Sequence, residues 1–145
     1  AWRACLAGRS PGRGPLAKGW PTPHWVFVSS VAGYRGLPQA ADYGASKAGL
    51  SYLAQVAHME LKPIGIDVSL VCPGFVSTRL TAKNQFDMPA VISPDQAATE
   101  ILKGLAKGHF EIHFPKRLSL VLKLLGLLPI GWYLRLVQRI NPHQH

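Results

Sequence analysis

Short apolar runs bounded by Gly, Pro and polar residues give the first outline of the fold. Such runs predict β-strands when they are rich in β-branched and aromatic residues, or when apolar and polar residues alternate. In the last run, apolar Phe110, Ile112 and Phe114 alternate with polar Glu111 and His113. We therefore expect three strands, at residues 25–29, 67–72 and 110–114.

A longer stretch, residues 40–61, has apolar residues at helical spacing and predicts a helix with a broad apolar face. The turn Lys62-Pro63-Ile64-Gly65 ends it, because proline and glycine interrupt helices. The residues expected on the apolar face are Ala48, Leu50, Leu53, Ala54, Val56 and Ala57.

A second helix is predicted from residue 94 to about residue 106. Ser93 is suited to cap it, Pro94 to occupy its first turn, and Gln96 to bond back to the cap. We expect this helix to bury Ala97, Ala98, Ile101, Leu102 and Leu105.

Residues 118–140 are rich in Leu, Val and Ile, but charged residues, glycines and a proline interrupt them. The longest uninterrupted apolar stretch is too short to cross a bilayer. Two short helices separated at residues 128–131 fit this pattern better. The second helix would carry Trp132 and Tyr133 together with Arg135 and Arg139, a combination typical of segments at a membrane surface.

The chain is basic, with a formal net charge of +9 from 16 Lys and Arg against 7 Asp and Glu. The basic residues gather in the first segment and the final third, without zinc-ligand spacing or an RNA-binding signature. We therefore expect no nucleic acid partner, and favour cofactor phosphates or a membrane surface. We also expect no metal site, because His109 and His113 fall around a strand. Cys5 and Cys72 are too few for a disulfide framework, which favours a reducing, cytoplasmic setting.

Ser30, Tyr43 and Lys47 have the spacing of a reaction centre. On a helix, Lys47 lies one turn beyond Tyr43 on the same face, and its positive charge favours the phenolate form. Lowering a tyrosine pKa from about 10 by roughly three units would let the phenol exchange protons near neutral pH. Ser30, at the end of the first strand, could hold a substrate oxygen. The chemistry indicated is proton transfer at a carbonyl or alcohol oxygen.

Three motifs in order, VFVSSVAG at 26–33, YGASKAGL at 43–50 and VCPGFVST at 71–78, resemble the short-chain dehydrogenase/reductase family. The similarity runs from residue 25 to residue 114, and residues 84–115 are similar to a loosely characterised bacterial branch. The resemblance implies an α/β fold. It would be the C-terminal half of a Rossmann-like doubly wound parallel sheet, with three legible strands and a helical C-terminal extension.

The resemblance also implies roles for individual residues. Tyr43 would be the general acid/base, Lys47 would depress its pKa and hold the nicotinamide ribose, and Ser30 would orient the substrate oxygen. The cofactor, NAD or NADP, would exchange a hydride with a small-molecule carbonyl/alcohol pair. The helix at 40–61 would join subunits of a homo-oligomer. The residues lining the nicotinamide side would be Pro73, Gly74, Val76 and Thr78.

Some features of the family have no counterpart. The glycine-rich turn that receives the cofactor pyrophosphate is missing, and no asparagine precedes Asn84. A domain of this kind has roughly 250 residues, whereas this chain has 145. We interpret the chain as a fragment lacking the nucleotide-binding half. Residues 1–24 would be an atypical Pro/Gly/Arg-rich segment, truncated or frame-shifted, 25–117 the C-terminal part of the domain, and 118–145 an apolar, basic helical extension.

Several alternatives stay open. The chain could be a non-catalytic remnant that acts in oligomerisation or in contact with a membrane or partner. The extension could cover the substrate pocket or a partner subunit, lie on a membrane surface through residues 118–140, or span the membrane. Residues 81–92 could form a substrate lid in which Phe86 and Met88 contact an apolar substrate, or be ordinary loop packing.

Overall fold

The computed structural model describes residues 23–77 and 91–140 of the chain. Three strands form a parallel sheet in the order β1-β2-β3. The strands are β1 (His24–Val28), β2 (Asp67–Pro73) and β3 (Glu111–Phe114). All three predicted strands are therefore confirmed, with ends within one residue of those expected, and the α/β fold class is confirmed with them.

Strand β2 occupies the centre of the sheet. It pairs with β1 from His24↔Asp67 to Val28↔Val71 and with β3 from Leu70↔Glu111 to Pro73↔Phe114. Its residues from Val68 to Cys72 are all buried, as expected for a parallel strand covered on both faces. In the described part of the chain β1 forms one edge of the sheet, and its Val26 and Val28 are exposed.

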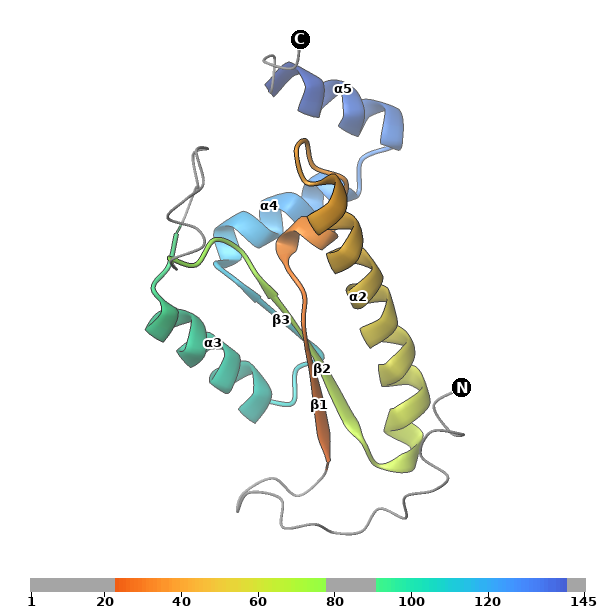
Figure 1. Ribbon diagram of the computed structural model, residues 1–145, viewed down its shortest axis with the longest axis vertical. Coiled ribbons are helices and arrows are strands. Elements are labelled where there is room, and N and C mark those ends of the chain that lie inside the picture. Colours follow the sequence, from red (N-terminus) through yellow and green to blue (C-terminus); the bar gives the residue numbers. More distant parts are fainter. Residues whose placement is uncertain (1–22, 78–90, 141–145) are drawn as a thin grey trace.

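Helices cover both faces of the sheet (Figure 1). Leu70 and Cys72 pack with Ala54 of α2 (Ala41–Leu61) and with Val31 of η1 (Val31–Gly33). Val71 points to the opposite face, because successive strand residues alternate, and packs there with Ala97 of α3 (Pro94–Ala106). The short helix η2 (Lys62–Ile64) follows α2. Gly65 completes the predicted stop with φ 80°, a conformation that glycine adopts without steric cost.

The predicted burial of these two helices was only partly right. In α2, Ala54 and Ala57 are buried, but Ala48 and Leu53 are exposed. In α3, Ser93 forms the predicted capping box with Gln96, yet Ala98 and Leu102 are exposed. Ala98 and Leu102 lie outside the row of α3 residues that faces the sheet. The members of that row are Ala97, Ile101, Gly104 and Leu105.

Two helices end the described chain, α4 (Lys116–Gly126) and α5 (Ile130–Ile140), separated where the sequence predicted a break. Leu118 and Leu122 of α4 pack against the same core as α2. Helix α5 lies beyond α4 at one end of the molecule (Figure 1). Among residues 23–77 and 91–140, no helix combines the length and apolarity required to cross a membrane.

Candidate active site

Ser30 lies where the carboxyl ends of β1 and β2 meet. It caps η1: its Oγ accepts a hydrogen bond from the amide of Ala32 (3.2 Å) and donates to the carbonyl oxygen of Pro73 (3.3 Å). The structure thus brings Ser30 and the Pro73-Gly74 turn to one rim of the sheet. Ligands of open parallel sheets bind at this rim.

Tyr43 and Lys47 occupy successive turns at the start of α2. The Lys47 Nζ atom lies 5.6 Å from the centre of the Tyr43 ring and donates a hydrogen bond to the carbonyl oxygen of Val28 (3.1 Å). This bond connects α2 to Val28, the last residue of β1, which directly precedes Ser29 and Ser30. Tyr43 is 51 % exposed, so the residue is accessible from solvent.

Ser29 is a supporting residue to which the sequence analysis assigned no role. Its buried hydroxyl donates to the carbonyl oxygen of Lys47 (2.8 Å) and lies 2.8 Å from the Ser51 hydroxyl. Since the Ser29 hydrogen goes to Lys47, Ser51 is the donor in the second bond. The sequence did contain a signal for this role: two consecutive serines follow a strand, and successive side chains along a strand point in opposite directions. Ser30 faces the rim, and Ser29 anchors α2.

Gly33 allows η1 to lie directly on the backbone of α2. A Cβ atom at this position would lie 2.8 Å from the carbonyl carbon of Lys47 and 2.9 Å from the amide nitrogen of Ala48. Gly44 makes the reverse approach, since its Cβ would lie 3.3 Å from the Ala32 carbonyl oxygen. These two glycines set the spacing between the serine segment and the Tyr43 helix.

The residues expected on the cofactor side follow β2. The Gly74 amide donates to the carbonyl oxygen of Phe114 (2.7 Å), and a Cβ on Gly74 would lie 3.0 Å from side-chain atoms of Leu118 and Pro115. Val76 forms an isolated parallel bridge with Ile92. The base of the predicted lid is therefore closed by backbone pairing. Thr78, Phe86 and Met88 lie outside the described residues.

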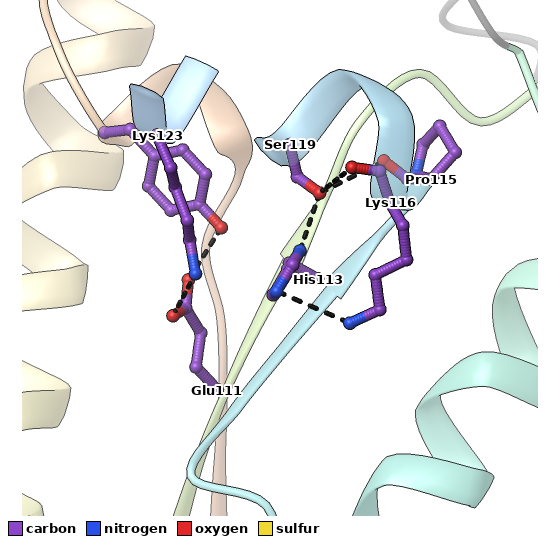
Figure 2. Close-up of polar contacts among 7 residues, drawn as sticks. Glu111, His113, Pro115, Lys116, Ser119 and Lys123 are labelled. Atoms are coloured by element: carbon purple, nitrogen blue, oxygen red, sulfur yellow. Dashed lines mark hydrogen bonds and ion pairs between the residues drawn. The ribbon is translucent and has the colours of Figure 1, made fainter. Parts of the chain in front are cut away.

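Glu111, the first residue of β3, joins this strand to two other segments. Its carboxylate accepts hydrogen bonds from the Tyr34 hydroxyl (2.6 Å) and from Lys123 Nζ (2.6 Å; Figure 2). Burial opposes ionisation of Glu111, but these bonds outweigh it and hold its pKa below the ordinary value. Burial and the bond to Glu111 raise the pKa of Tyr34. Burial also raises the pKa of the Cys72 thiol to about 11. At neutral pH Glu111 therefore stays ionised, and Tyr34 and Cys72 keep their protons. The bonds of Glu111 to Tyr34 and Lys123 act as structural contacts.

His113 of β3 contacts two residues of α4, Ser119 and Lys116 (Figure 2). Ser119 Oγ donates its hydrogen to the backbone of Pro115 or Lys116, so His113 Nδ1 must be the donor across its 2.6 Å contact with Ser119. The other ring nitrogen then accepts from Lys116 Nζ at 3.4 Å. Burial, Lys123 and Lys116 together lower the pKa of His113. Within residues 23–77 and 91–140, no three His, Cys, Asp or Glu residues gather to hold a metal ion.

Known proteins resemble this chain in sequence and in fold. The family model of short chain dehydrogenases matches residues 24–88. An uncharacterized oxidoreductase of Myxococcus xanthus (strain DK1622) is 40 % identical over 106 residues, 73 % of this chain and 42 % of its own length.

Two solved structures share the fold. A short chain dehydrogenase from Burkholderia cenocepacia J2315 in complex with NADP is 25 % identical with a TM-score of 0.66, covering 79 % of this chain and 47 % of its own. A short-chain dehydrogenase from Sphingobium yanoikuyae in complex with NADPH is 26 % identical with a TM-score of 0.60, covering 84 % and 47 %. The chain spans less than half the length of each of these relatives. With these matches and the parallel sheet, the chain belongs to the short-chain dehydrogenase/reductase family.

Proposed function

We propose that the full-length protein is an NAD- or NADP-dependent oxidoreductase that interconverts a carbonyl and an alcohol in a small molecule. The observation that carries this proposal is the pairing of an exposed phenol with an ammonium on successive turns of α2, beside a buried serine at the sheet rim. The family relationship and the two neighbours that hold NADP and NADPH support it.

Each of the three side chains has a distinct task. The Ser30 hydroxyl orients the substrate oxygen toward Tyr43. Tyr43 donates its proton to that oxygen during reduction and takes a proton from the alcohol during oxidation. The Lys47 ammonium stabilises the negative oxygen left when Tyr43 gives up its proton. Ser29 and Val28 hold the Lys47 turn in place through their bonds to its carbonyl oxygen and its Nζ.

The rim described above fits the nicotinamide end of the cofactor. It lies at the carboxyl ends of β1 and β2, and Gly74, which has no side chain there, packs closely against α4. Lys47 would hold the ribose, and the cofactor supplies the hydride. The residues that would line the nicotinamide are Pro73, Gly74, Val76 and Thr78.

Replacement of Tyr43 by Phe in the full-length protein tests the proton-transfer role. We expect turnover to fall by about a hundredfold or more, because the general acid is lost. The KM for the cofactor should stay nearly unchanged, because the ring and Lys47 remain. Glu60→Gln, at an exposed residue near the other end of the same helix, is the control. Turnover retained by Tyr43→Phe would contradict the assignment.

We also propose that the full-length protein is a homo-oligomer. Helix α2 leaves Tyr52, Leu53 and Met59 exposed on one long element, an apolar surface suited to a second copy. Sedimentation of the full-length protein measures its oligomeric state directly. A monomer at all concentrations would exclude the proposed homo-oligomer.

A second candidate function, contact with an anionic membrane surface, is favoured by the exposed side chains of α4 and α5. No Asp or Glu follows Glu111, whereas Arg117, Arg135 and Arg139 are exposed. Apolar side chains next to cations are typical of segments that lie at a lipid interface. The exposed apolar residues of this region are Leu120, Val121, Leu124, Leu127, Ile130, Trp132, Leu134 and Ile140.

Flotation with lipid vesicles separates this candidate from the enzymatic one. The full-length protein should float with phosphatidylserine-containing vesicles and remain behind with phosphatidylcholine alone. Replacing Arg135 and Arg139 by Gln should weaken the binding without changing turnover. Equal behaviour of the two vesicle types would argue against an electrostatic membrane contact.

A further inference from the structure

The loop between the serine and the tyrosine is bonded to both C-terminal helices. It follows η1, which Ser30 caps, and leads into α2, which carries Tyr43. Three consecutive residues of this loop, Tyr34, Arg35 and Gly36, each bond to residues at least 77 positions further along the chain. The loop is thus held from outside rather than by its own turns alone.

Arg35 closes the end of α4. Its Nη1 atom donates to the carbonyl oxygens of Leu128 (2.9 Å) and Leu125 (3.3 Å), and also contacts that of Gly126. The last carbonyls of a helix have no partner within it, and a cation there also meets the negative end of the helix dipole. Arg35 therefore supplies a cap from a distant segment.

Tyr133 holds α5 in the same place. Its side chain is only 2 % exposed, although most of α5 is open to solvent. Its hydroxyl donates to the carbonyl oxygen of Gly36 (2.6 Å), and the Arg35 guanidinium lies 4.5 Å from the centre of its ring. One tyrosine thus contacts two successive loop residues, with its hydroxyl and with its ring.

Tyr34 provides a third attachment, since its hydroxyl donates to Glu111, which also pairs with Lys123 of α4. We call this arrangement the clasp: the loop residues Tyr34, Arg35 and Gly36 with their partners Glu111, Lys123, Tyr133 and the end of α4.

The start of α2 packs on η1 through Gly44, but it has no side-chain cap. Its N-cap residue, Ala40, makes no side-chain capping bond, and Gln39 before it has φ 60°. A positive φ in a residue other than glycine is uncommon and persists where surrounding contacts hold it. Tyr43 lies in this uncapped first turn. Its position relative to Ser30 therefore depends on how the loop is held, as well as on the close packing of Gly44 against η1.

We propose that the clasp fixes the first turn of α2 relative to Ser30, so that Arg35 and Tyr133 are positioning residues for the centre of Ser30, Tyr43 and Lys47. This inference rests on the proposed oxidoreductase function. Reaction centres tolerate displacements of only a fraction of an ångström, so a loosened loop lowers turnover without removing any reacting group. The C-terminal helices then contribute to catalysis from outside the site.

The test uses the full-length protein with Arg35→Lys, which keeps the charge but loses the planar fork, and Tyr133→Phe, which keeps the ring but loses the donor. Lys107→Arg, at an exposed lysine that follows α3, is the control. We expect kcat to fall about tenfold in both clasp variants with the cofactor KM nearly unchanged. Hydrogen exchange should become faster at residues 31–44 and stay the same in α3.

Unchanged kcat would overturn the proposal, and so would exchange that rises uniformly across the molecule, since that pattern marks a role in stability alone. If the unsubstituted full-length protein turns over no carbonyl or alcohol with NAD(P), the proposed function fails. Hydrogen exchange then decides whether the clasp orders the loop: faster exchange confined to residues 31–44 supports this ordering, and unchanged exchange overturns it.

Discussion

At the scale of single residues, His113 couples folding to pH. In the folded chain its pKa lies below the ordinary value of 6.5, so the unfolded chain binds the proton first as pH falls. The stability that depends on neutral His113 is therefore complete above about pH 6.5 and declines below it. Glu111 acts with the same sign in a lower range. Its contribution is complete above pH 4.5 and is lost as pH falls through its depressed pKa.

His113→Gln should remove much of the pH dependence between about pH 7 and pH 5, because no group at this position then takes up a proton. Urea unfolding at several pH values measures the free energy of unfolding for each variant. His109→Gln, which changes an exposed histidine at the start of the same segment, is the control. The same slope in both variants and in the original protein would show that His113 does not cause the effect.

The contacts that could be predicted are those between residues close together in the sequence. Tyr43 and Lys47 meet because a helix brings positions four apart together, and Ser30 follows from the end of an apolar strand. The contacts of Arg35 with α4 and Tyr133 join positions about a hundred residues apart, so no local pattern predicts them. The sequence therefore indicated the groups that we propose to react, but not the contacts that hold them.

At the scale of elements, boundaries were predicted better than faces. The ends of α3 follow from Ser93, Pro94 and Gln96, whose capping bonds require neighbours in sequence only. The prediction that Ala98 and Leu102 are buried was wrong, because apolarity alone does not decide which side of a helix packs against the sheet. That choice depends on Gly104, against which Ile112 packs so closely that a Cβ there would lie 2.6 Å from its side chain.

Ser93→Ala should lower the free energy of unfolding by about 1 kcal/mol, since the amide of Gln96 loses its partner at the helix start. Ser93→Gly should cost only a few tenths of a kcal/mol, because glycine also suits this position. Thr99→Ala, within the same helix, is the control and should change little. Equal losses for Ser93→Ala and Thr99→Ala, measured by urea unfolding, would argue against the cap.

At the scale of the whole molecule, the described sheet has one well-covered strand and one open edge. Parallel sheets are stable when both faces and both edges are protected, and β2 meets that condition. Val26 and Val28 of β1 do not, because they remain exposed at the edge. The relatives have more than twice the length of the match. An exposed strand edge of this kind is a surface on which another strand can pair.

The rate at which the buried thiol near the end of β2 reacts can report how often the core of the protein opens. Cys72 is fully buried, and a thiol reacts only when it is exposed and ionised. With Cys5 replaced by Ser, a maleimide should label the protein only as fast as the sheet separates from α2. Labelling should quicken as urea is added, and rapid labelling without urea would show that the core opens freely. Motions of the region beneath Ser30 could thus be timed chemically, without a substrate or a cofactor.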